Sequence, residues 1–259
     1  MRLVMLGTGG FIPTDTAQTA CYLLPEVGVM LDAGTGVYRM SRYLPETAEL
    51  DVYLSHAHGD HTEGLTWLFA SFMLQELCAP VVDESTISGM LDRSNARLHS
   101  VRVHATQPTV DATRVRFEPF NLDWRLLTTP EALPQGGRIT HFSVSQGEEV
   151  GFRLDWPGHS LAYVTDTTAG PDVKYIENIR GVDLLLHDCN GPDRMAGLMD
   201  RISHSTPSAT AQVAARAGVE RLVLIHHNPM NWSIEEDLEA ARRIFANTEI
   251  GADGMELEF

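Results

Sequence analysis

The sequence predicts an α/β fold that gathers functional side chains at one edge of a sheet. Short apolar or β-branched runs suit buried strands at Val52–Leu54, Arg138–Thr140, Leu161–Thr165 and Leu222–Ile225. Helix-like patterns cover Thr62–Leu77, Ser208–Ala217 and Ser233–Asn247. Ligand-type side chains follow all four runs, at or near the point where each strand leaves the core. Because strand ends converge at one edge of an α/β sheet, we expect these side chains to lie close together.

The strongest signal follows the first of these runs. Residues 55–61 are Ser-His-Ala-His-Gly-Asp-His, a density of ligand-type groups that no packing role requires. In extended backbone, residues i and i+2 point to the same side, so His56 and His58 can hold one ion. Asp60 and His61 are adjacent and must diverge, so they can serve another ion. The stretch therefore predicts a site for two metal ions.

The other three strand ends supply the rest of the predicted ligand set. His141 would complete the site of the first histidine pair, and His226 would complete the site of the Asp-His pair. Asp166 would bridge both sites through its two oxygens. A set of imidazoles and carboxylates without thiolate favours a catalytic centre with Zn²⁺, or with Mn²⁺ or Fe²⁺.

Composition indicates one domain with a sizeable core. The chain has 259 residues, of which 43% are hydrophobic, and α/β folds with two sheets often reach this length as one unit. No run of about 18 apolar residues occurs, so no membrane span is expected. The three cysteines show no paired spacing, which favours a reducing compartment and a cytoplasmic location.

The charge bears on the class of substrate. A formal net charge of −16, with 35 acidic and 19 basic residues, repels polyanions and offers little basic surface for nucleic acid. Two divalent ions with two carboxylates and a hydroxide would leave the centre itself at about +1. We therefore expect a small anionic substrate and consider long nucleic acid an unfavourable partner.

The motif at His56–His61 resembles the His-x-His-x-Asp-His motif of the metallo-β-lactamase superfamily. Four further segments are similar to the ribonuclease Z-like branch, which includes the cyclic phosphodiesterase of phosphonate catabolism: Gly7–Gly10, Leu31–Gly36, Tyr163–Thr167 and Asp253–Met255. The resemblance spans nearly the whole chain. It implies a single domain over residues 1–259, built as a four-layer αβ/βα sandwich of two mixed β-sheets flanked by helices. It also implies the same seven metal ligands: His56, His58, Asp60, His61, His141, Asp166 and His226.

The resemblance implies two further catalytic roles. His204, within Ser203–Pro207, matches a family histidine that stabilises the phosphate and protonates the leaving group. Asp188, within Leu186–Asn190, stands where the family has a glutamate that orients this imidazole. A neighbouring carboxylate raises the pKa of an imidazole, which keeps a general acid protonated near neutral pH. An aspartate is one methylene shorter than a glutamate, so this pair departs from the family pattern.

The predicted activity is that of a di-metal phosphodiesterase that uses a metal-bridging hydroxide, oriented in part by Asp60, on a small phosphodiester or cyclic phosphate. Ribonuclease Z enzymes carry a long arm for tRNA, commonly between the third-motif histidine and the bridging aspartate. Here His141 and Asp166 are only 25 residues apart and a simple hairpin is expected between them. This spacing favours a small substrate.

Three alternatives stay open. A lactone or thioester hydrolase would use the same metals on a carbonyl group. A tRNA 3′-processing endonuclease would share the whole ligand set, and a non-hydrolytic protein of a biosynthetic pathway would bind metals without turnover. The resemblance also suggests a homodimer. Among the histidines outside the site, His104 is expected at the surface, whereas His187 and His227 are expected to pack.

Overall fold

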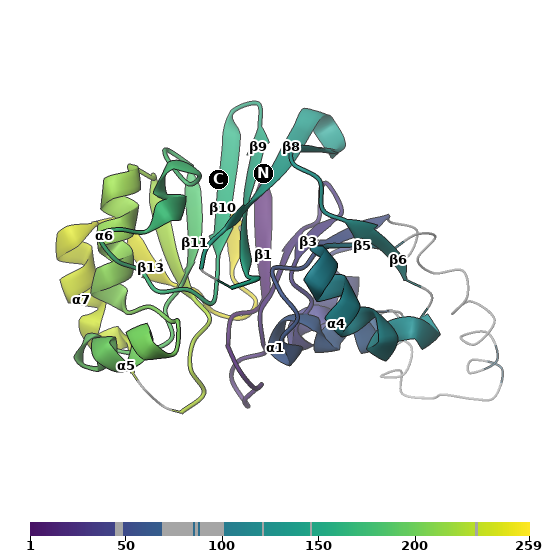
Figure 1. Ribbon diagram of the computed structural model, residues 1–259, viewed down its shortest axis with the longest axis horizontal. Coiled ribbons are helices and arrows are strands. Elements are labelled where there is room, and N and C mark those ends of the chain that lie inside the picture. The colour runs from purple at the N-terminus through teal and green to yellow at the C-terminus, as the bar shows by residue number, and fades with distance from the viewer. Residues whose placement is uncertain are drawn as a thin grey trace.

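The computed structural model describes residues 1–44, 49–68, 85, 88, 101–120, 122–145, 147–230 and 233–259. Two seven-stranded sheets form its centre, with strand orders β14-β1-β2-β3-β4-β5-β6 and β13-β12-β11-β10-β9-β8-β7. Figure 1 shows helices α5, α6 and α7 on the outer side of the second sheet, and α1 and α4 beside the first. Both termini lie near the junction of the two sheets.

The first sheet is mixed. Its N-terminal strands and β14 pair antiparallel, whereas β3 to β6 run parallel. Its strands are β1 (Arg2–Gly7), β2 (Cys21–Leu24), β3 (Val29–Leu31), β4 (Leu50–Tyr53), β5 (Val101–Ala105), β6 (Asp123–Leu126) and β14 (Glu256–Glu258).

The second sheet is mixed in the same way. An antiparallel meander from β7 to β10 is followed by parallel pairing from β10 to β13. Its strands are β7 (Glu131–Leu133), β8 (Gly137–Ser143), β9 (Val150–Trp156), β10 (His159–Val164), β11 (Leu184–Asp188), β12 (Arg221–Ile225) and β13 (Thr248–Ile250).

The helices occupy the two outer layers. The α-helices are α1 (Gly59–Thr62), α4 (Gln107–Phe117), α5 (Ala196–Arg201), α6 (Pro207–Ala217) and α7 (Glu235–Ile244). Short 3₁₀ helices accompany them at η1 (Thr35–Arg42), η2 (Glu63–Trp67), η4 (Glu118–Phe120), η5 (Pro134–Gly136), η6 (Lys174–Glu177) and η7 (Asp193–Met195).

Three apolar clusters separate the layers and confirm the predicted four-layer sandwich. The central cluster lies between the sheets, where Tyr22 of β2 meets Tyr163 of β10 with ring centroids 5.2 Å apart. A second cluster joins the first sheet to its helices and includes Phe117 of α4. The third joins the second sheet to α6 and includes Ala214. Each sheet therefore buries both faces, as layered packing requires.

Most predicted elements are present with shifted ends. The run Leu161–Thr165 forms β10, Leu222–Ile225 lies in β12, and Ser208–Ala217 lies in α6. The segment expected as one helix over Thr62–Leu77 is α1 followed by η2 up to Trp67, and its remainder from residue 69 lies outside the described residues. In the described part of the chain, no helix is long and apolar enough to cross a membrane.

The expected surface position of His104 is wrong. This residue lies in β5 and is buried, with its ring stacked on Tyr53 at a centroid distance of 4.4 Å. Its Nε2 lies 2.8 Å from Asp51 of the neighbouring strand, and its Nδ1 lies 3.0 Å from Glu131 of the opposite sheet. A single imidazole thus connects the two sheets at this edge.

Candidate metal centre

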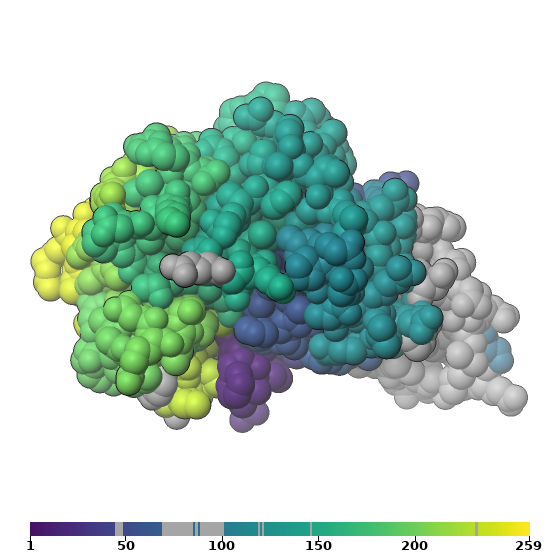
Figure 2. Space-filling model, in the orientation of Figure 1, coloured from purple at the N-terminus to yellow at the C-terminus, as the bar shows by residue number. Residues whose placement is uncertain are grey.

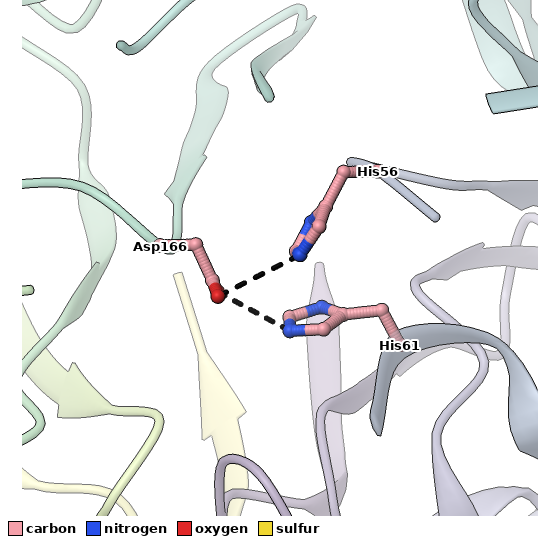
Figure 3. Close-up of side chains that lie close together, drawn as sticks. All are labelled: His56, His61 and Asp166. Carbon is pink, nitrogen blue, oxygen red and sulfur yellow. Dashed lines mark ion pairs between the residues drawn. The ribbon is translucent and has the colours of Figure 1, made fainter. Parts of the chain in front are cut away.

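The ends of three strands bring the predicted ligands to one edge of the sandwich. His56 to His61 follow β4 and run into α1, Asp166 comes two residues after β10, and His226 directly follows β12. Asp166 and His226 have positive φ values of 48° and 62°, so the backbone turns sharply where it leaves each strand. Figure 3 shows Asp166 pointing toward His56 and His61 from the opposite sheet.

Two triads of donor atoms share His61 Nε2 and His226 Nε2, and one is completed by Asp60 Oδ2 and the other by Asp166 Oδ1. The His61 Nε2 atom lies 3.4 Å from Asp60, 3.2 Å from Asp166 and 3.2 Å from His226. The His226 Nε2 atom lies 3.2 Å from Asp60 and 3.3 Å from Asp166. Tetrahedral zinc bonds of about 2.0–2.1 Å place neighbouring ligand atoms about 3.3–3.4 Å apart. The separations within each triad therefore fit adjacent ligands of a tetrahedral ion.

A second donor set shares Asp166 through its other oxygen. The Oδ2 atom lies 3.6 Å from His56 Nε2 and 3.9 Å from His58 Nδ1, and the two imidazole nitrogens are 2.8 Å apart. The side chain of His58 is 67% exposed. This set is more open than the first and supplies three donors from the predicted residues. Asp166 thus lies between the two donor sets, with one carboxylate oxygen near each.

His141 lies within a strand and not just after the end of one. Strand β8 continues to Ser143, so His141 lies inside the strand and pairs with Phe152, which belongs to the core between the sheets. Its Nδ1 is buried and has no hydrogen-bond partner among the described residues. None of the described ligand clusters includes it. The predicted position of His141 after a strand end is wrong, because β8 extends two residues beyond it, whereas its role as a metal ligand stays a prediction.

Asp32 contacts His61 on the side of the ring that faces away from the other donors. It was not among the predicted site residues. Its Oδ2 accepts hydrogen bonds from His61 Nδ1 at 2.6 Å, Tyr163 Oη at 2.6 Å and Ser55 Oγ at 2.7 Å. A carboxylate on Nδ1 fixes the tautomer, so the lone pair of His61 Nε2 faces the other donors. Asp32 follows β3 directly, the same strand-end pattern that predicted Asp166 and His226.

The predicted pair of His204 and Asp188 adjoins the first donor set. His204 Nδ1 lies 2.9 Å from Asp188 Oδ2, and the His204 ring stacks on His226 with centroids 5.2 Å apart. Asp188 is fully buried and also lies 3.1 Å from His226 Nδ1. Its other oxygen accepts the N–H of Ser205 at 2.7 Å. One carboxylate thus orients both a candidate ligand and the candidate acid.

A superfamily profile described as "Beta-lactamase superfamily domain" matches residues 28–227. The chain belongs to the β-lactamase superfamily. It is a metal-dependent hydrolase of that superfamily, which confirms the family and the enzyme class predicted from the motif.

Relatives named ribonuclease Z match the chain over its whole length. Those of Parasynechococcus marenigrum (strain WH8102) and Synechococcus sp. (strain CC9605) are 28% and 29% identical, and each alignment covers 100% of this chain and 98% of the relative. The alignments span 315 positions against 259 residues here, so these relatives carry insertions that this chain lacks. Their name is at odds with the expectation that long nucleic acid is an unfavourable partner.

Solved structures confirm the metallo-β-lactamase fold. The metallo-β-lactamase fold protein YhfI from Bacillus subtilis has a TM-score of 0.76 at 18% identity, over 100% of this chain and 99% of that one. The short form of human tRNase Z gives 0.71 at 18% identity, over 100% and 99%. A diphosphatase of the PhnP family gives 0.69 at 20% identity, over 100% and 97%. At these identities the likeness shows the fold.

The electrostatics suit a cation between the two sheets of this superfamily fold. Burial lowers the pKa of His56 to about 4, which keeps its imidazole neutral and able to bind metal. Burial would also lower the pKa of His226, but the charge of Asp166 and hydrogen bonds to Asp188 and Asp60 raise it to about 10. The neighbouring imidazoles hold the pKa of Asp60 and Asp166 well below the usual range despite their burial. Metal binding would therefore displace a proton from His226 and find His56 already neutral and the carboxylates already ionised.

Backbone strain is concentrated at the centre. Of the described residues other than glycine, six have positive φ, and five of these belong to the centre or contact it: Phe11, Asp32, Asp166, Ser203 and His226. Such conformations cost of order 1–3 kcal/mol each and persist where the surrounding structure enforces them. Strain of this kind collects at functional sites.

A pocket of about 550 Å³ opens above the donors, a volume typical of small-molecule sites. His58, Asp60, Asp166, His204 and His226 line its polar part. Its outer part is apolar and comes from the N-terminal loop and from the segment before His204. None of the described residues that line this pocket is a lysine or an arginine.

Proposed function

We propose that this protein is a di-metal phosphodiesterase, with zinc as its metal, that hydrolyses a small phosphodiester or cyclic phosphate. One observation carries the proposal. The His204–Asp188 pair lies directly beside His226 and the other donor atoms, so candidate metal ligands and a candidate proton donor meet at one pocket. Phosphodiester hydrolysis needs both parts, because the leaving alkoxide must receive a proton.

Separate residues would bind the metals, orient the attacking group and protonate the leaving group. His56, His58, Asp60, His61, Asp166 and His226 would hold two divalent ions. When bound, such ions supply a nucleophile at neutral pH and offset the charge of the phosphoryl oxygens. Asp60 would also orient the attacking group by accepting a hydrogen bond. The Nδ1 of His204 is bonded to Asp188, so its Nε2 is the nitrogen that can protonate the departing oxygen.

Two features support a small substrate. Strands β8, β9 and β10 follow one another with connections of only a few residues, so no arm separates residue 141 from Asp166 in this part of the chain. Moreover, the described pocket lining supplies no cationic side chain, whereas binding of long nucleic acid depends on phosphate contacts from lysine and arginine.

A second candidate is an endonuclease that acts on RNA, and the relatives named ribonuclease Z favour it. These relatives align over the whole chain, and the donor set would serve an RNA phosphodiester equally well. The two candidates differ in the size of the substrate and share the reaction class.

The test is a parallel hydrolysis assay of the metal-loaded protein. Bis-p-nitrophenyl phosphate and 2′,3′-cyclic AMP represent small phosphodiesters, a precursor tRNA represents long RNA, and a lactone and a thioester represent carbonyl substrates. We expect turnover of the small phosphodiesters above that of His61→Ala and Asp166→Ala controls. Cleavage of the precursor tRNA alone would establish the second candidate. Bound metal without turnover of any probe would favour the non-hydrolytic alternative.

The homodimer and the cytoplasmic location stay predictions. Light scattering of the purified protein tests the first, and fractionation of the source cells tests the second.

A further inference from the structure

A strained turn carries an exposed aromatic ring at the mouth of the pocket. Phe11 has a φ of 69°, and the N–H of Ile12 donates to the carbonyl of Gly10 at 2.9 Å across it. The Phe11 residue is 65% exposed and lines the pocket. Figure 2 shows the purple N-terminal segment projecting at the lower edge, between the yellow-green and blue parts of the surface.

A hydrogen bond and close backbone packing hold the turn against two of the candidate metal ligands. The backbone N–H of Phe11 donates to Asp60 Oδ2 at 2.7 Å. A Cβ atom on Gly10 would lie 2.5 Å from the ring of His226, so only glycine lets the backbone approach so closely. The N–H of Gly10 donates to the carbonyl of His227 at 2.9 Å. The position of the turn is therefore fixed relative to the donor atoms.

Packing of the Phe11 ring does not explain why a phenylalanine occupies this strained backbone position. A bulky residue at positive φ is a conformational outlier, whereas glycine adopts the same backbone without that cost. The ring recovers little of this cost by burial, because most of its surface faces solvent. An outlier of this kind beside a reaction centre points to contact with a ligand.

The rest of the outer pocket has the same apolar character. Ile12 is 51% exposed and Ile202 is 45% exposed, and both line the pocket together with Phe11. The additional charged groups of the lining are two carboxylates, Glu63 and Glu149. Glu63 pairs with Arg116, but the Glu149 carboxylate would repel a second phosphate, whereas a neutral apolar group would contact the three hydrophobic side chains. The charge distribution therefore favours a substrate with one anionic group and a neutral, apolar remainder.

We propose that the substrate carries one phosphodiester, held at the metal centre, and a planar aromatic ring that packs against Phe11, Ile12 and Ile202. The ring belongs to a nucleobase or to a simple aryl group, which share this chemistry. Aromatic side chains bind such rings by offset stacking or edge contacts. This inference rests on the proposed function and adds a specificity-determining residue to it.

Two matched pairs of probes test the proposal and separate the two sources of the ring. The nucleobase pair is 2′,3′-cyclic AMP against glycerol 1,2-cyclic phosphate. The aryl pair is the cyclic phosphate of 1-phenylethane-1,2-diol against the cyclic phosphate of propane-1,2-diol, which differ only in a phenyl or a methyl group. We expect Phe11→Ala to raise KM for the ring-bearing member of at least one pair about tenfold more than for its ring-free partner. The pair that responds identifies the source of the ring.

Further variants exclude an indirect effect. Phe11→Tyr should restore the low KM, because it keeps the ring. Val115→Ala, which removes an exposed apolar side chain on α4 outside the pocket, should leave every KM unchanged. Metal content by mass spectrometry should match the wild type in all variants, because the N–H of residue 11 remains in each. An equal loss for ring-bearing and ring-free probes would overturn the proposal.

A binding measurement keeps this inference distinct from the proposed function. Calorimetry with adenosine 3′-monophosphate and with glycerol phosphate needs no turnover. If the wild type hydrolyses no phosphodiester, the proposed function fails, and a weaker adenosine 3′-monophosphate affinity in Phe11→Ala would still support the ring contact. Equal affinity of both proteins for adenosine 3′-monophosphate, together with an unchanged KM for both ring-bearing substrates, would reject that contact.

Discussion

His61 Nδ1 lies 2.6 Å from Asp32 Oδ2, and both side chains are completely buried. The Nε2 of the same ring faces Asp60, Asp166 and His226 at 3.2–3.4 Å. The carboxylate thus determines which nitrogen of His61 can bind metal. Tyr163 reaches the same carboxylate from the other sheet, so the packing of the sandwich and the geometry of the centre depend on one residue.

Asp32→Asn should weaken metal binding by about 10–100-fold, because it removes the charge that orients His61. Competition with a chromophoric chelator measures this affinity. Tyr163→Phe is the matched control, since it removes one hydrogen bond to Asp32 and keeps the charge. It should cost about 1 kcal/mol in the free energy of unfolding and leave the metal affinity near that of the wild type. Equal metal affinity in Asp32→Asn and the wild type would show that His61 needs no orienting group.

His204→Ala should lower kcat by about 10²–10⁴-fold on phosphodiesters with alkoxide leaving groups, because those need a proton. The loss should be far smaller with p-nitrophenolate, which departs without one. Steady-state kinetics on both substrate types provide the comparison, and unchanged metal content shows that the centre is intact. A similar loss with both leaving groups would contradict the role of general acid.

The two donor sets should bind metal unequally. The side chains of Asp60, His61, His226 and Asp166 are at most 11% exposed, whereas His58 of the other set is largely exposed. His58→Ala should lower the metal content from about two to about one ion per chain, and His226→Ala should deplete the buried site. Mass spectrometry after dialysis against a weak chelator measures both. Retention of two ions by His58→Ala would exclude this assignment.

The strand-end pattern predicts well which side chains gather at the candidate centre where the strand ends with its apolar run. Asp166 and His226 meet that condition, and both lie in the centre. At His141 the condition fails, because β8 extends two residues further and its register sets that side chain beside Phe152. A run of apolar residues shows where a strand lies, but cross-strand pairing decides where it stops.

Other features depend on long-range contacts that residue types do not encode. Asp32 carries the strand-end signal, yet its partner His61 stands 29 positions later. Phe11 occupies a backbone conformation that favours glycine, so its residue type does not predict the turn. His104 is buried where Tyr53 of its own sheet and Glu131 of the other sheet contact its ring. Each of these depends on how the two sheets meet.

Asp51 gives a pH-dependent prediction away from the metal centre. Burial would raise the pKa of Asp51, but hydrogen bonds from Arg102 and His104 lower it from 3.8 to about 2. Because the folded pKa lies below its ordinary value, the stabilisation is complete above about pH 4–5 and is lost as the pH falls toward 2. Asp51→Asn should therefore reduce the free energy of unfolding most at neutral pH, and the difference from wild type should shrink in acid.

Urea unfolding between pH 7 and pH 3, with a chelator present in every sample, measures this difference. The chelator matters because metal release in acid would otherwise change the stability of both proteins. Asp15→Asn is the matched control, since it changes an exposed aspartate and should shift stability little at any pH. A difference between Asp51→Asn and wild type that stays constant down to pH 3 would mean that the carboxylate is not titrating there. The cluster of Asp51, Arg102 and His104 would then stabilise the sheet edge by packing, because a charge interaction must weaken as the carboxylate gains its proton.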